Sequence, residues 1–184
     1  MKKILTLVVL AAAMIMVSSC EKDDEPEKVI ATIGAQSNTT TGGYYSVAEK
    51  KVYTQANAFA NQDKVDILCF YEAESGNNIA LASPGSGITG IFTGDDAPEN
   101  WTTQNTTYFL ITTLTASQFD AMAETDELIV TSFVEADARK KAKDMQPDMV
   151  VSFKTQDGTY GLLKVMEVTQ GATGSVKFEV KIKK

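Results

Sequence analysis

Oxygen-bearing side chains suited to ligand binding gather in the polar stretch between residues 75 and 107. Asp95, Asp96, Glu99 and Asn100 offer carboxylate and amide oxygens close together, and these are the ligands that Ca²⁺ prefers. Their spacing matches no known calcium-binding loop, so a solvated turn is the simpler interpretation and no metal site is predicted. A long irregular stretch of this kind is unusual in a compact domain and often carries function.

An aromatic ring stands directly beside this cluster. Trp101 follows Asn100 and precedes a run of Thr, Gln and Asn side chains that ends at Tyr108. Aromatic rings beside amide and hydroxyl groups are typical of carbohydrate-binding surfaces, because a ring presents an apolar face next to hydrogen-bonding partners. We therefore predict a contact surface formed by Trp101, Asn100, Tyr108, Asp95 and Asp96. The alternative is that Trp101 packs the loop onto the core.

The composition excludes several classes of function. The chain has no histidine, so it cannot build a Ser-His-Asp or Cys-His nucleophile or a histidine metal site. Its formal net charge of -7 argues against nucleic-acid binding, which needs a basic surface. A pair of carboxylates can cleave glycosides without histidine, and the 24 acidic side chains leave that route open.

Residues 85–90 read G-S-G-I-T-G, which matches the glycine pattern of dinucleotide-binding loops. That pattern binds a pyrophosphate only where a strand precedes it and a helix begins within it. The residues that follow include Gly94, Asp95, Asp96 and Pro98, which do not favour a helix. We therefore predict a glycine-rich loop and no cofactor.

The first residues indicate an export signal. Lys2 and Lys3 precede an apolar segment at 4–17, which is shorter than the roughly 20 residues of a transmembrane helix. Val17-Ser18-Ser19-Cys20 resembles a bacterial lipobox, and this resemblance implies cleavage before Cys20 and acylation of that cysteine. Anchoring by more than one acyl chain is stable. The alternative is an ordinary secretory signal followed by a cysteine by chance.

Residues 21–28 are charged and contain no apolar side chain whose burial could offset the entropy of ordering them, so we predict a flexible tether. An acidic run after a lipidated cysteine also resembles the surface-export signal of Bacteroidota lipoproteins, which implies display on the outer face of the outer membrane. The alternative is a plain tether on a periplasm-facing lipoprotein. The chain thus divides into a signal at 1–19, the lipidated Cys20 with its tether at 20–28, and one domain at 29–184.

Strands and a short helix are expected to connect and position the polar loops of the domain. Alternating or β-prone segments predict strands at 29–33, 44–47, 51–54, 65–71 and 108–114. The strand at 65–71 has little polarity, so it should be covered on both faces, with Cys69 as a buried and unreactive thiol. Ala56, Phe59 and Ala60 have the spacing of one helical face and predict a short helix at 55–62.

One or two helices are predicted between residues 115 and 143. Thr115 and Gln118 match a capping box, and Phe119 and Met122 follow at helical spacing. The apolar residues of 128–136 continue that spacing, although the β-branched residues of 128–134 also suit a strand. We prefer a helix that ends in the basic run 139–143, whose charges complement the negative end of a helix dipole.

The C-terminal third predicts a three-stranded antiparallel meander. Strands at 149–155 and 160–169 flank Asp157-Gly158, a strong hairpin signal, and two glycines within 170–174 form the next turn. The third strand, at 175–183, alternates apolar residues with lysine and glutamate, which predicts one buried and one solvated face. Its lysines also suit an exposed sheet edge, where they discourage pairing with other chains.

The residues of this meander also carry a resemblance. M-Q-P-D-M-V-V-S-F-K-T at 145–155, followed by Asp157-Gly158 and Y-G-L-L-K-V at 160–165, resembles a pattern in an uncharacterised family of Bacteroidota lipoproteins. Pro147 stands where the family pattern usually has glycine. The family carries no established activity, so the resemblance implies a location and a β-meander but no chemistry.

From these patterns we expect an α+β domain built mostly of antiparallel sheet. The expected function is that of a noncatalytic outer-membrane lipoprotein that faces the cell surface and acts as a binding or accessory module for a glycan or an envelope protein. A structural or adhesive envelope component is the first alternative, and a histidine-free carboxylate hydrolase is the second. The expected partner is the lipid bilayer, through acylated Cys20, and nucleic acid is not expected.

Overall fold

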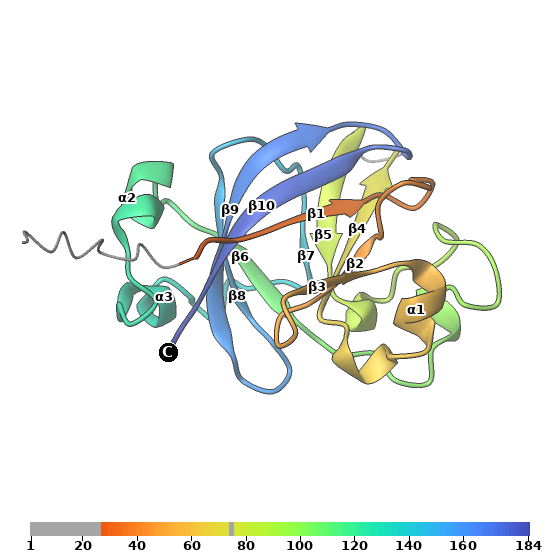
Figure 1. Cartoon of the computed structure of the whole chain (residues 1–184), viewed down its shortest axis with the longest axis horizontal. Helices are drawn as coiled ribbons and strands as arrows, with labels where there is room; N and C mark the ends of the chain where they lie inside the picture. The colour runs from red at the N-terminus through yellow and green to blue at the C-terminus, as the bar shows by residue number, and fades with distance from the viewer. Residues whose placement is uncertain (1–26, 74–75) are drawn as a thin grey trace, which may run out of the picture.

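The computed structural model describes residues 27–73 and 76–184. In this part of the chain, two five-stranded antiparallel sheets are accompanied by three short α-helices, which confirms the predicted α+β class with mostly antiparallel strands (Figure 1). The predicted signal at 1–19, the predicted lipidation site Cys20 and residues 21–26 of the predicted tether lie outside the described residues. Within the described ranges, no helix has the length and apolar character that a membrane crossing requires.

Both sheets are built from segments that are far apart in the sequence. Sheet A is formed by β1 (Val29–Gly34), β6 (Tyr108–Ile111), β8 (Val150–Lys154), β9 (Tyr160–Thr169) and β10 (Ser175–Ile182). Its strand order is β1-β10-β9-β8-β6. Sheet B is formed by β2 (Tyr44–Ser46), β3 (Lys51–Tyr53), β4 (Ile67–Glu72), β5 (Asn78–Ala82) and β7 (Lys141–Ala142). Its strand order is β3-β2-β4-β5-β7.

The predicted C-terminal meander is confirmed, because β8 pairs with β9 and β9 pairs with β10, all antiparallel. Gly158, in the turn between β8 and β9, has a φ of 90°, a backbone conformation that glycine adopts without strain. The third strand is not an edge strand, however. β1 pairs along its other side, from Val29 opposite Val180 to Gly34 opposite Ser175, so the lysines of β10 protect no edge.

The main hydrophobic core lies between the two sheets. Successive side chains of a strand point to opposite faces, so alternate residues of both sheets enter this space. Cys69 and Tyr45 of sheet B meet Phe153 and Phe178 of sheet A there, and the Tyr45 ring packs edge-on against Phe178 with centroids 5.5 Å apart. Cys69 is fully buried as predicted, and burial raises the pKa of its thiol.

The outer faces of both sheets are covered as well. The covering helices are α1 (Gln55–Phe59), α2 (Ala116–Ala121) and α3 (Leu128–Thr131). In Figure 1, α2 and α3 lie together at the opposite end of the molecule from α1. Phe119 of α2 contacts Leu162 of sheet A, whereas the loop from Ser83 to Thr107 places Trp101 in a cluster with Phe70 of sheet B. Strand β4 therefore contributes to clusters on both of its faces, as predicted.

Two short helices occupy only part of the predicted helical region. The capping box of Thr115 and Gln118 is confirmed at the start of α2, and α3 begins at Leu128. The predicted helix through 132–143 was wrong. Arg139 forms an isolated antiparallel bridge with Phe109 through N···O distances of 2.7 and 2.8 Å, and Lys141–Ala142 is strand β7. Pairing with distant strands therefore overrides the helical spacing, and the basic run does not end a helix.

Two predicted faces also differ from the structure. In α1, Ala58 is buried while Phe59 is 40% exposed, so the face predicted from Phe59 is not the one that packs. In β10, Glu179 lies on the face predicted to be solvated but is only 3% exposed. The reason is that Glu179 pairs with Lys164, whose ammonium lies over the Phe119 ring of α2, so helix packing removes this part of the face from solvent.

Candidate functional site

The Trp101 side chain, which was predicted to contact a ligand, is part of the core. It is 5% exposed, its ring lies 5.5 Å from the Tyr44 ring, and its Nε1 donates a hydrogen bond to the carbonyl of Asp96 at 2.8 Å. These contacts fix the loop on sheet B. The alternative interpretation of Trp101, as the residue that packs the loop onto the core, is therefore the one that the structure supports.

The polar side chains around Trp101 form hydrogen bonds within the loop and with the neighbouring segment at 55–63. Asp96 accepts a hydrogen bond from Gln55 Nε2 at 2.6 Å, and Asn100 donates to the Gly94 carbonyl at 3.2 Å. Asp95 is exposed. Among the described residues, no group of three or more acidic or cysteine side chains is arranged to hold a metal ion.

Tyr108 does not share a surface with Trp101. It is 40% exposed on β6 of sheet A, opposite Lys154, whereas Trp101 is buried against sheet B. The loop between Trp101 and Tyr108 crosses from the outer layer of one sheet to the edge of the other, which separates the two rings. The five residues of the predicted contact surface therefore do not assemble into one site, and a ligand-binding role for Asp95 or Tyr108 remains a prediction.

The glycine-rich segment 85–90 forms no phosphate-binding loop. A short 3₁₀ turn spans Pro84–Ser86, and no helix begins in or directly after the segment. Gly85 instead packs closely on the chain before β6, since a Cβ at this position would lie 2.6 Å from Thr106 Oγ1. The glycine here serves close packing of two loop segments, in agreement with the prediction of a glycine-rich loop.

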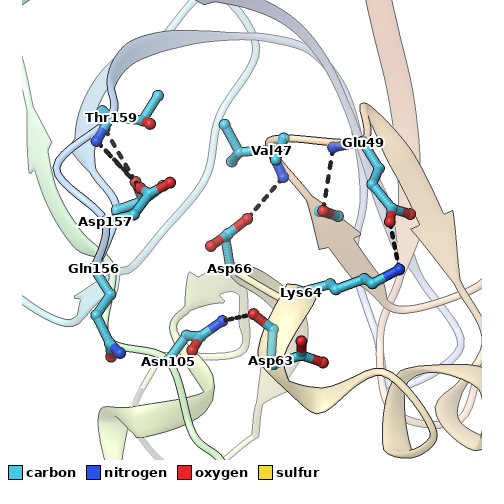
Figure 2. A pocket seen from close by; sticks show the side chains of 12 residues that line it. Val47, Glu49, Asp63, Lys64, Asp66, Asn105, Gln156, Asp157 and Thr159 are labelled. Atoms are coloured by element: carbon cyan, nitrogen blue, oxygen red, sulfur yellow. Dashed lines mark hydrogen bonds and ion pairs between the residues drawn. The ribbon is translucent and has the colours of Figure 1, made fainter.

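A cleft of about 370 Å³ opens between the turn that joins β2 to β3 and the turn that joins β8 to β9. Figure 2 shows its two sides: Asp157 and Thr159 come from the β8–β9 turn, and Val47 and Glu49 come from the β2–β3 turn. Asn105 lies at the base in this view. The volume falls within the range of small-molecule sites, which is roughly 300 to 1,000 Å³.

The carboxamide of Asn105 is held in one orientation. The residue is 8% exposed, and its Nδ2 donates to the carbonyls of Asp63 at 2.8 Å and Val65 at 3.1 Å. Both partners are acceptors, so the nitrogen must face them and the oxygen must face away. Asn105 lines the cleft, and its Oδ1 accepts no hydrogen bond from the described residues and is not buried from solvent. The cleft thus contains a fixed acceptor that is open to a ligand.

Asp66 is a largely buried carboxyl group in the same cleft. Its Oδ2 accepts a hydrogen bond from the Val47 amide at 2.8 Å, and this bond favours the ionised form. Burial outweighs that effect and raises the pKa of Asp66 to about 6, with a smaller contribution from the negative charge of Asp157. Asp66 therefore gains or loses its proton near pH 6, which is slightly below neutral pH.

Asp157 has the opposite electrostatic environment. The Thr155 hydroxyl donates to its carboxylate, and the Thr159 amide donates to the same oxygen, Oδ1, at 3.2 Å. The hydrogen bond from Thr155 is the main reason why the pKa of Asp157 is lowered, because it stabilises the charged form. The two carboxyl groups of this cleft thus have pKa values that are shifted in opposite directions.

The rim of the cleft adds further charge. Lys64 forms an ion pair with Glu49 at 2.7 Å, and the pKa of Glu49 is lowered mainly by that partner. Altogether four carboxylates line the cleft, from Glu49, Asp63, Asp66 and Asp157, against the single ammonium of Lys64. The cleft is therefore electronegative, and its one ammonium is already paired.

Sequence reasoning missed this cleft. Asp157 was recognised only as a turn residue, and Asn105 only as one of many polar residues before Tyr108. The one local signal is Asp66, a carboxylate directly before the apolar residues of β4. A carboxylate in this position must be paired or lie at an opening of the core, because burial of an unpaired charge is costly.

Two other hollows, of about 350 and 400 Å³, are less suited to a ligand. The first lies beside Asn38, whose Oδ1 already accepts hydrogen bonds from the Thr40 and Thr41 amides. The second lies beside α2, where Asp120 and Glu179 both pair with Lys164. Since their polar groups are largely satisfied within the described chain, the cleft at Asn105 is the strongest candidate site.

Comparison with known proteins adds one similarity. No protein-family profile matches the sequence, and no curated protein matches it. A solved structure of a DUF4466 family protein from Parabacteroides merdae ATCC 43184 is similar, with 18% sequence identity and a TM-score of 0.57. The match covers 84% of this chain and 53% of that protein, so the chain spans about half the length of its structural neighbour. At this identity the likeness shows a shared fold, and in that respect it supports the resemblance to an uncharacterised family of Bacteroidota.

Proposed function

We propose that this protein is a noncatalytic lipoprotein of the cell envelope that binds a polar ligand in the cleft between the β2–β3 and β8–β9 turns. The ligand is a glycan, or a group on an envelope protein, that supplies hydrogen-bond donors to Asn105 and Asp66. The cleft takes the place of the Trp101 surface that the sequence suggested, because the Trp101 ring is buried.

The main support for this proposal is that the Asn105 side chain is held in one orientation while its oxygen has no hydrogen-bond partner in the described chain. Because this oxygen is open to solvent and not buried, a ligand that donates to it replaces a water molecule, and such a hydrogen bond contributes on the order of 0.5–1.5 kcal/mol. The site is also preorganised, because two hydrogen bonds hold the amide before any ligand arrives. A ligand hydroxyl or amino group that enters the cleft meets Asp66 and Asn105 without the need to reorder them.

The test fills the cleft without removing any of its hydrogen bonds. Ala48 is an exposed residue of the cleft wall, so Ala48→Trp places an indole in the opening. Ala136→Trp, at an exposed position outside the cleft, is the matched control. A glycan array and crosslinking on intact cells identify ligands for the wild-type protein, and we expect Ala48→Trp alone to lose them. Equal binding by both variants, or no ligand in either assay, contradicts the proposed function.

The envelope location rests on the sequence, since the lipobox-like Val17–Cys20 precedes the domain. Replacement of Cys20 by alanine removes the acylated sulfur and should release the protein from membranes into the soluble fraction. Continued retention in the membrane fraction contradicts the anchor. Accessibility to protease added to intact cells then separates surface display from the periplasm-facing alternative.

A second candidate function is favoured by the opposite pKa shifts of Asp66 and Asp157. Divergent pKa values in one cleft are a pattern of acid and base pairs in carboxylate hydrolases. In that reaction, protonated Asp66 gives its proton to the leaving glycosidic oxygen, and Asp157 accepts a proton from the attacking water. The hydrogen bonds that lower the pKa of Asp157 also make it a weak base, which is why binding is preferred. Turnover of aryl glycosides that Asp66→Asn abolishes supports the hydrolase, and hydrolysis no faster than in buffer excludes it for those substrates.

A further inference from the structure

We infer that the group held between Asp66 and Asn105 is a cation, either an alkylammonium or a guanidinium. This inference rests on the proposed function, because it requires that the cleft is the binding site, and it goes further by assigning the charge of the ligand. Three features of the described residues lead to it: the kind of hydrogen-bonding atoms that remain open, the charge of the lining, and the presence of two acceptors from neighbouring segments in one cleft.

The open atoms of Asn105 and Asp66 are acceptors. Asn105 Oδ1 accepts no hydrogen bond within the described chain, and Asp66 receives one, at Oδ2, from Val47. The ammonium of Lys64 is paired with Glu49, and the Thr155 hydroxyl donates to Asp157, whereas the neutral side chains of Ser46, Gln156 and Thr159 line other parts of the cleft. A ligand group that contacts both Asp66 and Asn105 therefore has to bring donors, which ammonium and guanidinium groups supply without offering any acceptor.

The charge of the lining separates a cation from a neutral polyol. Four carboxylates face the cleft against one paired lysine, and Asp157 remains ionised because its neighbours lower its pKa. A concave site with charge of one sign concentrates ligands of the opposite sign. A hydroxyl group satisfies Asn105 equally well but gains little from the surrounding charge. Hydrogen bonds between ionised partners are also about twice as strong as neutral ones.

The geometry suits a group with at least two donors. Asn105 and Asp66 line the same cleft, and Asn105 is tied to the carbonyls of Asp63 and Val65, which flank Asp66 in the chain. An amide oxygen and a carboxylate carried by neighbouring segments can accept from two N–H groups of one ligand group. A guanidinium presents such a pair in a fixed plane, and an ammonium presents three donors on one atom.

The test compares cations with neutral groups of the same shape. Ethylguanidinium and ethylurea are titrated into the full-length protein in detergent at neutral pH, with binding followed by NMR shifts of the cleft residues. In a second arm, an Arg-containing tripeptide is compared with the same peptide carrying citrulline, which replaces the guanidinium by a urea. We expect each cation to bind about tenfold more tightly than its urea, the difference between charged and neutral hydrogen bonds. Binding in the first arm alone identifies a free small cation, and tighter binding of the peptide identifies a basic side chain of a partner protein.

A charge-removing variant tests the assignment to Asp66. Asp66→Asn keeps the acceptor for the Val47 amide but turns the second oxygen into a donor, and we expect it to lower the affinity for the cations about tenfold and to lower that for the ureas less. Asp95→Asn removes the same charge from an exposed loop outside the cleft and should change neither. Equal affinity for cations and ureas overturns the inference, as does saccharide binding in the cleft without binding of either cation. The proposed function survives both of those results, whereas it fails only if Ala48→Trp leaves all ligand binding intact or no ligand is found.

Discussion

Lys164 and Glu179 form an ion pair across neighbouring strands of sheet A, with 3.1 Å between Nζ and Oε2, under the cover of helix α2. The Glu179 side chain is 4% exposed and that of Lys164 is 12% exposed. Lys164 also pairs with Asp120 of α2, and its ammonium lies 5.1 Å from the centre of the Phe119 ring. The pair therefore connects the helix to the sheet at a place where both charges are largely removed from water.

Replacement of Glu179 by alanine should destabilise the fold substantially. Removal of one partner leaves the buried Lys164 ammonium with Asp120 alone, and breaking a buried pair in this way costs about 3 kcal/mol. Urea denaturation measures the loss. Glu167→Ala is the matched control, because Glu167 pairs with Lys177 on the same sheet but is 71% exposed. An exposed pair contributes less than about 1 kcal/mol, so equal losses in the two variants contradict the role assigned to Glu179.

Gly161 should not tolerate a side chain. A Cβ at this position would lie 2.3 Å from Cζ of Phe153 and 2.8 Å from the Lys181 carbonyl. Gly161→Ala should therefore lower the free energy of unfolding by about 1–3 kcal/mol, the range for overpacked cores. Phe153→Leu removes the ring atoms that clash but not the Lys181 carbonyl, so the double variant should lose less than the two single variants together. Strictly additive losses in this double-mutant cycle show that the Phe153 ring is not the obstacle.

The stability of the fold should depend on pH between about 4 and 6 because of Asp66. Its pKa is raised to about 6 in the folded chain, above the value of about 3.9 for an unfolded aspartate. The folded state therefore binds this proton more tightly, and the contribution of Asp66 to stability falls as the pH rises from about 4 to about 6 and is constant above that range. The difference of about two pKa units corresponds to about 3 kcal/mol.

Comparison with Asp66→Asn isolates this contribution. The variant resembles the protonated side chain at all pH values, so it should match the wild-type protein near pH 4 and exceed its stability near pH 7 by up to about 3 kcal/mol. Denaturation in urea at the two pH values gives the difference, with Asp95→Asn as the control for loss of one negative charge. A constant gap between wild type and Asp66→Asn at both pH values refutes the raised pKa.

Trp101 should report on the fold and not on the ligand. It is the only tryptophan of the chain and is 5% exposed, so its emission should resemble that of an apolar environment and resist quenching by iodide. Trp101→Ala should cost about 3–5 kcal/mol, because it leaves a cavity beside Tyr44. Ligands of the cleft should leave the fluorescence unchanged, since Trp101 does not line it. Efficient quenching of the native protein contradicts the burial of this ring.

Several elements could be predicted because local residues determine them. The capping box of Thr115 and Gln118 needs only side chains three positions apart, and the Asp157-Gly158 turn between alternating strands needs only a short hairpin. The order of the meander follows from the same short connections. The helix predicted through Arg139 failed for the opposite reason, because the bridge to Phe109 spans a part of the chain that no local spacing describes.

The candidate site, like the bridge of Arg139, depends on residues that are far apart in the chain and could not be predicted from local patterns. Asp66, Asn105 and Asp157 come from three separate connections, and each looks like an ordinary polar residue in its own segment. Only the packing of sheet A on sheet B brings their turns to one cleft, where burial raises the pKa of Asp66 and two carbonyls orient Asn105. The sequence by itself thus determined the strand-rich class, the meander and the exclusion of histidine chemistry, since these depend on composition and near neighbours. The tertiary structure alone decided that Trp101 is core and that the cleft is acidic, because burial and charge at a site depend on residues that are distant in the chain.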